Sequence, residues 1–347
     1  MPAKRTSQWI LTPNGGVAGL RIQGNASIPD VTGRQCLVRI EAVSLNYRDI
    51  AMAFGRYPLP LTNSFVPCSD GAGQIIAKGT QVTGFQVGDK VCMCFMQDHQ
   101  DGIITPKIRQ SSLGSQRDGV LRQYGIFEET GLVPLPKSLS FVEGSTLPCA
   151  AVTAWNCLFG LESRSLRKGD VLLTQGTGGV SIFAIQFALA IGATVISTTS
   201  TSEKEEKLKK LGVHHVLNYK SNPDWGEEAK SMTPDGLGVH HVIEVGGEAT
   251  IPQSMKAIRP EGVVSMVGFL GGKSNNPASF SLIQNALCII RGINVGSRKM
   301  FQDMNSFIEA NGIKPIVSSR MFGFQEAREA YQYVEKQDFW GKTVIRI

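Results

Sequence analysis

The stretch Val171–Gly192, VLLTQGTGGVSIFAIQFALAIG, joins a short apolar strand, a glycine-rich turn and an apolar helix. Gly176, Gly178 and Gly179 allow the backbone to turn tightly and to approach a ligand closely. The N–H groups that open the helix, from Val180 onward, favour an anion such as the pyrophosphate of a dinucleotide. This strand, turn and helix together predict a dinucleotide-binding site.

Outward from this stretch, strand-like and helical segments alternate between residues 139 and 294. Such alternation is typical of βαβ units, whose parallel sheet is covered by helices on both faces. The expected strands are Val171–Thr174, Thr194–Thr198, Val216–Leu217, Val239–Val245 and Val263–Val267, and the expected helices include Val180–Ile191 and Ser202–Leu211. We therefore expect a doubly wound, Rossmann-type parallel sheet over 139–294.

The remainder of the chain does not show this alternation of strands and helices. The first third is rich in β-type patterns, and the closing segment Gly341–Ile347 alternates like a strand that needs a partner. The expected strands of the first third are Gln35–Leu45, Gly71–Ala77 and Val87–Phe95, and helices are expected at Phe301–Ala310 and Phe324–Lys336. We predict that residues 1–138 and 295–347 form one discontinuous β-rich domain, into which the parallel-sheet domain is inserted.

Composition limits the classes of function. The chain has 347 residues, 42% of them apolar, and a net charge of +6. Its one dense charge run, Glu203–Lys210, mixes both signs, which argues against nucleic-acid binding. Seven cysteines, an odd number in apolar surroundings, indicate free thiols in a reducing compartment. No apolar run is long enough to span a bilayer and the first residues do not look like a secretory signal, so we expect a cytoplasmic enzyme that binds no membrane.

The end of the second strand indicates which dinucleotide is bound. An NAD enzyme tends to have an acidic residue there for the ribose hydroxyls. This chain instead has a run of hydroxyl residues that includes Ser200, with Lys204 shortly after. Hydroxyl donors and one positive charge suit a 2′-phosphate, so we expect NADP(H). The alternative is that the hydroxyls only cap the next helix, with Ser202 and Glu205 forming a capping box.

The order of short motifs resembles the medium-chain dehydrogenase/reductase superfamily, close to quinone oxidoreductases and zinc-independent alcohol-dehydrogenase-like proteins. The landmarks are Asn46-Tyr47-Arg48-Asp49, Asp70-Gly71-Ala72-Gly73, Gly88-Asp89-Lys90-Val91, Leu147-Pro148, Thr153-Ala154-Trp155, the glycine turn, Asn218-Tyr219, Val242-Ile243-Glu244, Gly268-Phe269 and Gly341-Lys342. The resemblance implies a GroES-like β-barrel domain and a Rossmann domain, with the active site in the cleft between them. Dimers are common in that superfamily, so a homodimer is one expected assembly.

The resemblance also implies roles for single residues. Tyr219 is expected against the adenosine phosphate beside Lys204, and Thr153 is expected near the nicotinamide. The remaining residues expected to contact the cofactor are Asn46, Val245, Phe269, Ser297 and Arg298. Taken alone, Tyr219 could equally serve packing and Arg298 could be a surface charge.

Zinc members of the superfamily hold a catalytic ion with a cysteine, a histidine–glutamate pair and a second cysteine. At the matching positions this chain has Asn46, Ser69-Asp70 and Cys149. Because a catalytic zinc needs three protein ligands, we expect no metal there. Cys92 and Cys94, near Asp98 and His99, offer a second conceivable metal site, with packing as small hydrophobes as the alternative.

Without a metal, another group must hold the negative charge that develops on the substrate oxygen. Reduction of a conjugated C=C bond spreads this charge into an enolate, which a few hydrogen bonds can hold. The Asn46 amide and the Tyr57 hydroxyl are the candidate donors, although Asn46 could equally bond only loop backbone. We expect an NADPH-dependent reductase of an enone or quinone. A metal-free carbonyl reductase or alcohol dehydrogenase, and an NADPH-binding protein with little catalysis, are the alternatives.

Overall fold

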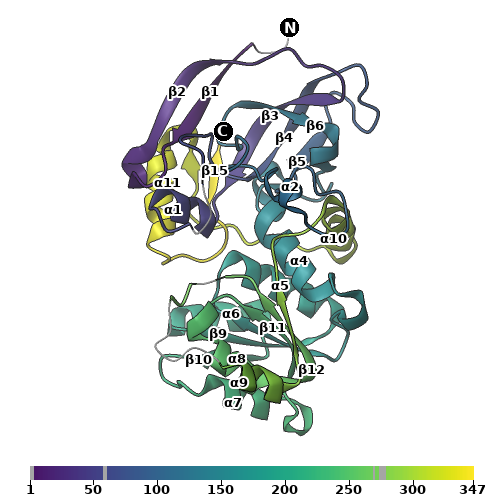
Figure 1. Cartoon of the computed structure of the whole chain (residues 1–347), viewed down its shortest axis with the longest axis vertical. Coiled ribbons are helices and arrows are strands. Elements are labelled where there is room, and N and C mark those ends of the chain that lie inside the picture. Colours follow the sequence, from purple (N-terminus) through teal and green to yellow (C-terminus); the bar gives the residue numbers. More distant parts are fainter. Residues whose placement is uncertain (1–3, 58–60, 269, 273–278) are drawn as a thin grey trace. The chain divides into compact units, whose positions relative to one another are not determined.

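The computed structural model describes residues 4–57, 61–268, 270–272 and 279–347. The chain forms two compact units, which Figure 1 shows coloured along the sequence. The first unit contains residues 1–152 and 297–347, and the second contains 153–296. The expected insertion of one domain into another is therefore present. Its boundaries differ from those expected at 138/139 and 294/295, because the segment that follows residue 138 packs with the first unit.

The first unit is built on a seven-stranded sheet. Its strands, in spatial order, are β14 (Phe322–Gly323), β15 (Val344–Arg346), β3 (Gln35–Ser44), β4 (Asp70–Lys78), β5 (Lys90–Met93) and β7 (Leu132–Pro134), with β6 (Tyr124–Glu128) also paired to β3. A separate two-stranded sheet joins β1 (Arg5–Leu11) to β2 (Leu20–Ser27). The expected strand Val87–Phe95 is shorter in the structure, since its first residues form a turn at Gly88, where φ is +100°.

The closing strand β15 pairs antiparallel with β3 and joins the two ends of the first unit. In this register Val344 lies opposite Ser44, and on the other side of β3 the same Ser44 lies opposite Asp70 in β4. The expectation that the C-terminal strand pairs with the β-rich first third is confirmed. Residues just after β3, just before β15 and at the start of β4 therefore lie at the same end of these three strands.

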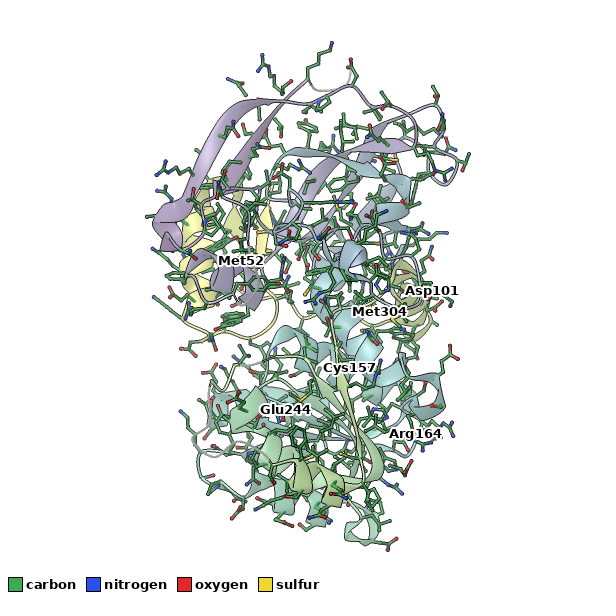
Figure 2. The ribbon with its side chains drawn as sticks, viewed as in Figure 1. Met52, Asp101, Cys157, Arg164, Glu244 and Met304 are labelled. Atoms are coloured by element: carbon green, nitrogen blue, oxygen red, sulfur yellow. The ribbon has the colours of Figure 1, made fainter. Side chains whose placement is uncertain are left out.

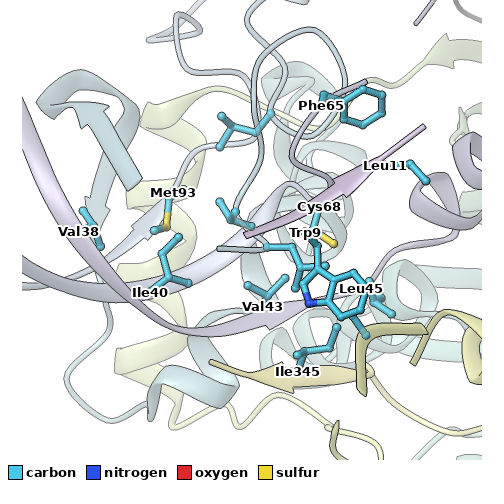
Figure 3. Packing of buried hydrophobic residues seen from close by; sticks show 14 of the residues in the cluster. Trp9, Leu11, Val38, Ile40, Val43, Leu45, Phe65, Cys68, Met93 and Ile345 are labelled. Atoms are coloured by element: carbon cyan, nitrogen blue, oxygen red, sulfur yellow. The ribbon is translucent and has the colours of Figure 1, made fainter. Parts of the chain in front are cut away.

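The core of the first unit lies under this sheet. Figure 3 shows Trp9, Leu11 and Phe65 with residues of β3 and Ile345 of β15, all with at most 5% of their surface exposed. The indole N–H of Trp9 donates to the carbonyl of Phe324 over 2.8 Å, so the buried aromatic ring keeps a hydrogen bond. The helices of this unit are α1 (Tyr47–Ala53), α2 (Pro106–Arg109), α3 (Phe141–Gly144), α10 (Arg298–Asn311) and α11 (Ala327–Glu335).

The second unit contains a parallel sheet, as predicted, but with six strands where five were expected, because the strand Ile289–Gly292 was not predicted. In spatial order they are β10 (His215–Asn218), β9 (Thr194–Thr199), β8 (Val171–Gln175), β11 (Val239–Glu244), β12 (Ile258–Met266) and β13 (Ile289–Gly292). The helices are α4, which begins at the boundary (Val152–Phe159), α5 (Gly179–Ile191), α6 (Ser202–Leu211), α7 (Trp225–Ser231), α8 (Ile251–Ala257) and α9 (Phe280–Ala286). The order reverses between β8 and β11, where dinucleotides bind in such sheets.

Helix α5 is apolar on nearly every face because it is buried against this sheet. It ends at Gly192, whose φ of +79° is the left-handed conformation that a glycine adopts most easily. Within the described residues, no helix combines the length and the apolar character needed to cross a bilayer. All seven cysteines are in the described part, and each is a free thiol.

Candidate functional site

The glycine turn after β8 leaves open space for a ligand. Gly176 has a φ of +68°, and its N–H donates to the carbonyl of Thr198 over 2.9 Å. A side chain built on Gly176 or on Gly178 would meet no described atom within 4 Å. Gly178 is the N-cap of α5, and no described side chain caps this end of the helix. The first N–H groups of the helix, from Gly179 and Val180 onward, are therefore available to a phosphate.

Ser181 occupies the position where the usual fingerprint has a third glycine. Its hydroxyl donates to the carbonyl of Gln175 over 2.8 Å, and the residue is buried. The serine therefore fixes the first turn of α5 to the end of β8. This arrangement keeps the helix and the strand close together without glycine.

The residues expected at the adenosine end of the cofactor lie at the carboxyl ends of neighbouring strands of the parallel sheet. β9 ends at Thr199, followed by Ser200, and the N–H of Tyr219 donates to the carbonyl of Thr199 over 3.1 Å. Lys204 is half-buried in the first turn of α6. Ser200, Lys204 and Tyr219 thus follow two neighbouring parallel strands at their carboxyl ends, where ligands bind in such sheets. Tyr219 has 42% of its surface exposed and can pack against a ligand.

The capping alternative is wrong in its detail. The N-cap of α6 is Thr201, whose hydroxyl accepts from the N–H of Lys204 over 3.3 Å. Ser202 is the first helical residue, so it does not form a capping box with Glu205. One hydroxyl of the run is used by the helix, and Ser200 is not the residue used.

The loop after β11 is held by a buried carboxylate. Glu244, labelled in Figure 2, has no exposed surface and accepts from the N–H groups of Gly246 and Gly247 over 2.9 and 3.0 Å. It also accepts from Gln175 Nε2 over 2.6 Å and from the hydroxyls of Thr250 and Ser254. This network fixes the backbone beside Val245, one of the residues expected to contact the cofactor. We did not identify Glu244 or Gln175 as site residues from the sequence.

The other residues expected to contact the cofactor are divided between the units. Thr153 is buried in α4 of the second unit. Ser297 and Arg298 belong to the first unit, where Ser297 is the N-cap of α10 and Arg298 donates from Nε to the carbonyl of Leu132 over 2.9 Å. Arg298 is thus not a free surface charge. Phe269 lies outside the described residues, so its expected role stays a prediction.

In the first unit, the four positions that correspond to the zinc ligands come together around a lysine. Lys342 Nζ donates to Asn46 Oδ1 over 2.5 Å and to the carbonyl of Leu45 over 2.7 Å, and lies 3.9 Å from Asp70 Oδ2. Asp70 accepts from Ser69 Oγ over 2.7 Å and from the N–H of Cys149 over 3.1 Å. We call these five residues, Asn46, Ser69, Asp70, Cys149 and Lys342, the Lys342 cluster.

Charge and burial set the protonation of this cluster. Burial raises the pKa of Asp70, and the ammonium of Lys342 is the largest effect that opposes it. Burial and the neighbouring Asp70 raise the pKa of the Cys149 thiol to about 12. Without a cation bound to it, this thiol is therefore protonated at neutral pH.

These residues do not fit a catalytic zinc ion. Asn46 Oδ1 already binds a cation, and a dication placed beside it would be repelled by the ammonium of Lys342. In the described ranges, no group of three His, Cys, Asp or Glu side chains is arranged to hold a metal ion. At the second conceivable metal site, Asp98 is paired with Arg117 at 2.6 Å, and His99 Nε2 is 3.0 Å from the carbonyl of Gly102. Burial raises the pKa of both Cys92 and Cys94.

Tyr57 lies close to the start of α1. The guanidinium carbon of Arg48 is 5.8 Å from the centre of the Tyr57 ring and 4.6 Å from that of Phe95. Arg48 itself is held by the carbonyl of Leu113 over 3.0 Å and by Ser115 Oγ over 2.9 Å. Two residues from Asn46 along the chain, Arg48 therefore fixes the surroundings of Tyr57. The structure thus brings both expected hydrogen-bond donors, Asn46 and Tyr57, to the same end of the first unit.

Known proteins are similar to this chain along its whole length. The family model of the alcohol dehydrogenase GroES-like domain matches residues 32–137, and that of zinc-binding dehydrogenases matches 179–310. A zinc-type alcohol dehydrogenase-like protein of Schizosaccharomyces pombe is 48% identical over 90% of this chain and 91% of its own length. The 2-methylene-furan-3-one reductase of Solanum lycopersicum is 29% identical over 97% of this chain and 78% of its own. The crystal structure of a candidate alcohol dehydrogenase from Sinorhizobium meliloti is 34% identical, covers 100% of both chains and has a TM-score of 0.89.

Proposed function

Because this chain belongs to the medium-chain dehydrogenase/reductase superfamily, whose members are oxidoreductases, we propose that it is a zinc-independent, NADPH-dependent reductase of conjugated C=C bonds. The substrates are small enones or quinones. The observation that carries this proposal is the contact of Lys342 Nζ with Asn46 Oδ1. At the position where zinc members have their first metal ligand, this chain has an amide bound to an ammonium.

The chain's own residues would hold the cofactor as follows. The turn of Gly176, Gly178 and Gly179, with Val180, receives the pyrophosphate at the N-terminus of α5. Ser200 and Lys204 receive the 2′-phosphate, and Tyr219 packs beside it. Thr153, Val245, Ser297, Arg298 and Phe269 are proposed for the nicotinamide end. When bound, the reduced nicotinamide supplies the hydride.

The polar residues of the first unit then hold the substrate. In an enone, reduction at the β-carbon moves negative charge onto the carbonyl oxygen, and the resulting enolate needs donors rather than a strong acid. The Asn46 Nδ2 group and the Tyr57 hydroxyl supply these donors. Solvent supplies the proton that completes the reduction at the α-carbon.

The named relatives support two chemistries. The tomato protein is named as a reductase of a 2-methylene-furan-3-one, a compound in which a C=C bond stands beside a ring ketone. The fission yeast and Sinorhizobium proteins are named for alcohol dehydrogenase, which favours a carbonyl reductase or alcohol dehydrogenase as the second candidate. Since the position of the first zinc ligand holds an amide bound to the ammonium of Lys342, we favour the first.

Label transfer distinguishes these functions. The protein is incubated with NADPH deuterated at the 4-position of the nicotinamide and with a panel of enones, quinones and ketones. We expect deuterium on the β-carbon of the reduced enone. Deuterium on a carbinol carbon, with the double bond intact, would instead assign the second candidate, and no transfer to any compound would assign a binding protein.

A further inference from the structure

The backbone around Lys342 is fixed by its neighbours. Gly341 has a φ of +84°, and a side chain at this position would lie 2.7 Å from the carbonyl oxygen of Ile316. The N–H of Lys342 donates to that carbonyl over 2.9 Å, and the carbonyl of Lys342 accepts from the N–H of Ser318 over 2.9 Å. The backbone of Lys342 is therefore held on both sides, immediately before β15.

Strand register directs this side chain to the amide. Val344 is opposite Ser44, and the N–H of Leu45 donates to the carbonyl of Thr343 over 3.0 Å. Continuing the antiparallel register by one more step brings Lys342 opposite Asn46. The contact of 2.5 Å between Lys342 Nζ and Asn46 Oδ1 is thus built into the pairing of β15 with β3.

The ammonium of Lys342 is buried, and its hydrogen bonds go to uncharged oxygen atoms. Only 5% of Lys342 is exposed, and a buried charge is costly unless it is paired. Its nearest carboxylate in the described part of the chain, Asp70, lies at 3.9 Å, within ion-pair range but outside hydrogen-bond distance. The hydrogen bonds of the ammonium go instead to the carbonyl of Leu45 and to Asn46 Oδ1.

The bond of Lys342 to Asn46 Oδ1 also determines where the Nδ2 group of the amide lies. A flipped amide would place its NH₂ group against the ammonium, so the lysine fixes which end is the donor. Asn46 Nδ2 is buried and makes no hydrogen bond to the described residues. It faces Asp70 and lowers the pKa of that carboxyl as a hydrogen-bond donor does, although by less than Lys342 and Ser69 do. The donor end of the amide is therefore fixed, and of its two N–H groups at most one is directed to Asp70.

We propose that Lys342 is a positioning residue, which holds the Asn46 amide so that its N–H donor is directed to the substrate oxygen. This inference rests on the proposed function for the identity of the reaction, but the orientation of the amide does not depend on it. Lys342 acts through Asn46 and does not itself touch the substrate.

The kinetic test uses Lys342→Met, Lys342→Arg and Asn46→Ala, alone and combined, with the enone that the wild type reduces. We expect Lys342→Met to lower kcat about tenfold or more, with KM for NADPH unchanged, and Lys342→Arg to restore part of the rate. In the Asn46→Ala background, Lys342→Met should lower kcat no further, because the group that it positions is gone. Full additivity of the two substitutions would overturn the proposal. Lys336→Met, an exposed lysine of the same unit, is the control for loss of one charge.

A second variant keeps the test valid if Lys342→Met does not fold. Asn46→Asp keeps an oxygen for Lys342 and replaces the N–H donor by a second carboxylate oxygen. We expect its melting temperature to be retained and its kcat to fall about 10²-fold, as for loss of one oxyanion donor. An Asn46→Asp enzyme with the wild-type kcat would contradict the role of the donor.

A spectroscopic measurement separates this inference from the proposed function. The side-chain amide signals of Asn46 are identified in a ¹⁵N–¹H spectrum by their absence in Asn46→Ala. They should shift or broaden in Lys342→Met and stay unchanged in Lys336→Met. If the wild type reduces no enone but these signals respond, the proposed function fails and the positioning role stands. If the signals do not respond to Lys342→Met, the positioning role fails whatever the reaction is.

Discussion

Gln175 Nε2 donates to Glu244 Oε2 over 2.6 Å, although the two residues end different strands and stand 69 positions apart. β8 and β11 are the neighbours between which the order of the parallel sheet reverses. Gln175 Oε1 in turn accepts from the N–H groups of Val245 and Gly246, both over 3.1 Å. The buried Gln175 amide and the buried Glu244 carboxylate thus connect the start of the glycine turn to the loop after β11.

Replacing Gln175 by leucine should loosen this loop. The substitution leaves the Glu244 carboxylate with one hydrogen bond fewer and the Val245 N–H without its acceptor, whereas the Gly246 N–H keeps its bond to Glu244. We expect a loss of about 1.5–3 kcal/mol in the free energy of unfolding, together with weaker NADPH binding. Urea unfolding and a cofactor titration measure the two effects. Gln302→Leu, on the exposed side of α10, is the control, and equal effects of both substitutions would refute the role of Gln175.

Lys204 should determine the choice between the two dinucleotides. Lys204→Ala removes a charged donor to the 2′-phosphate, which typically contributes about 1.5–3 kcal/mol, so the Kd for NADPH should rise roughly ten- to hundredfold. The Kd for NADH should stay nearly constant, since NADH lacks that phosphate. Lys210→Ala, at the other end of α6, is the matched control. A wild type that binds both dinucleotides equally well would show that the assignment of NADPH is wrong.

Zinc should be absent from the purified protein and dispensable. Asn46 Oδ1 is bound to an ammonium, and Ser69 stands where zinc members have a histidine, so the Lys342 cluster offers no set of three ligands. Elemental analysis of protein purified without added metal should find far less than one zinc per chain. Activity should survive incubation with a chelator. One zinc per chain, together with activity that a chelator abolishes, would contradict our interpretation of Asn46 and Ser69.

His241 should make the fold sensitive to acid. It is 4% exposed in the central strand β11, and burial lowers its pKa from 6.5 to about 4. Between these two values the unfolded chain binds a proton that the folded chain does not, so stability is present above pH 6.5 and is lost as the pH falls toward 4. The loss amounts to about 3 kcal/mol at most. Unfolding curves from pH 7 to pH 4 should show a smaller slope for His241→Leu than for the wild type, while His215→Leu should keep the wild-type slope.

We propose that the protein is a homodimer joined at the β13 edge of the parallel sheet. β13 is an edge strand among the described residues, and edge strands present unpaired N–H and C=O groups. Close to it in the sequence, Phe280 is 91% exposed and Leu287 is 64% exposed. Light scattering should give twice the chain mass of 37.5 kDa, and Phe280→Glu should shift it toward the monomer. Ile103→Glu, which changes an equally exposed residue of the first unit, should not.

The sequence was sufficient to predict the parallel sheet, because its strands and helices are marked by strong local signals. The expected helix Ser202–Leu211 has the observed bounds, and the strand expected at Thr194–Thr198 extends by one residue. The family resemblance and the two-domain fold are confirmed by the family models and by the Sinorhizobium structure. Segments with weak periodicity were not predicted, among them the hairpin of β1 and β2 and the short helices α7, α8 and α9.

The Lys342 cluster shows why the site was only partly predicted. Asn46 could be identified because it stands at the position of a known ligand. Lys342 was noted only as a motif residue, since nothing local shows that its side chain is buried. The one signal in the sequence is a lysine in the otherwise apolar, alternating end GKTVIRI. Its contact with Asn46 depends on a strand pairing across nearly the whole chain, which local patterns do not encode.

The pairing of β15 with β3 also fixes the order in which the parts can form during synthesis. A ribosome completes every strand of the second unit, up to Gly292, before it adds Lys342. The parallel sheet is continuous in the chain and can fold as it emerges, whereas the sheet of the first unit has to wait for its last strand. A nascent chain stalled shortly after residue 300 would therefore already possess its glycine turn, but its Asn46 amide would have no lysine to orient it.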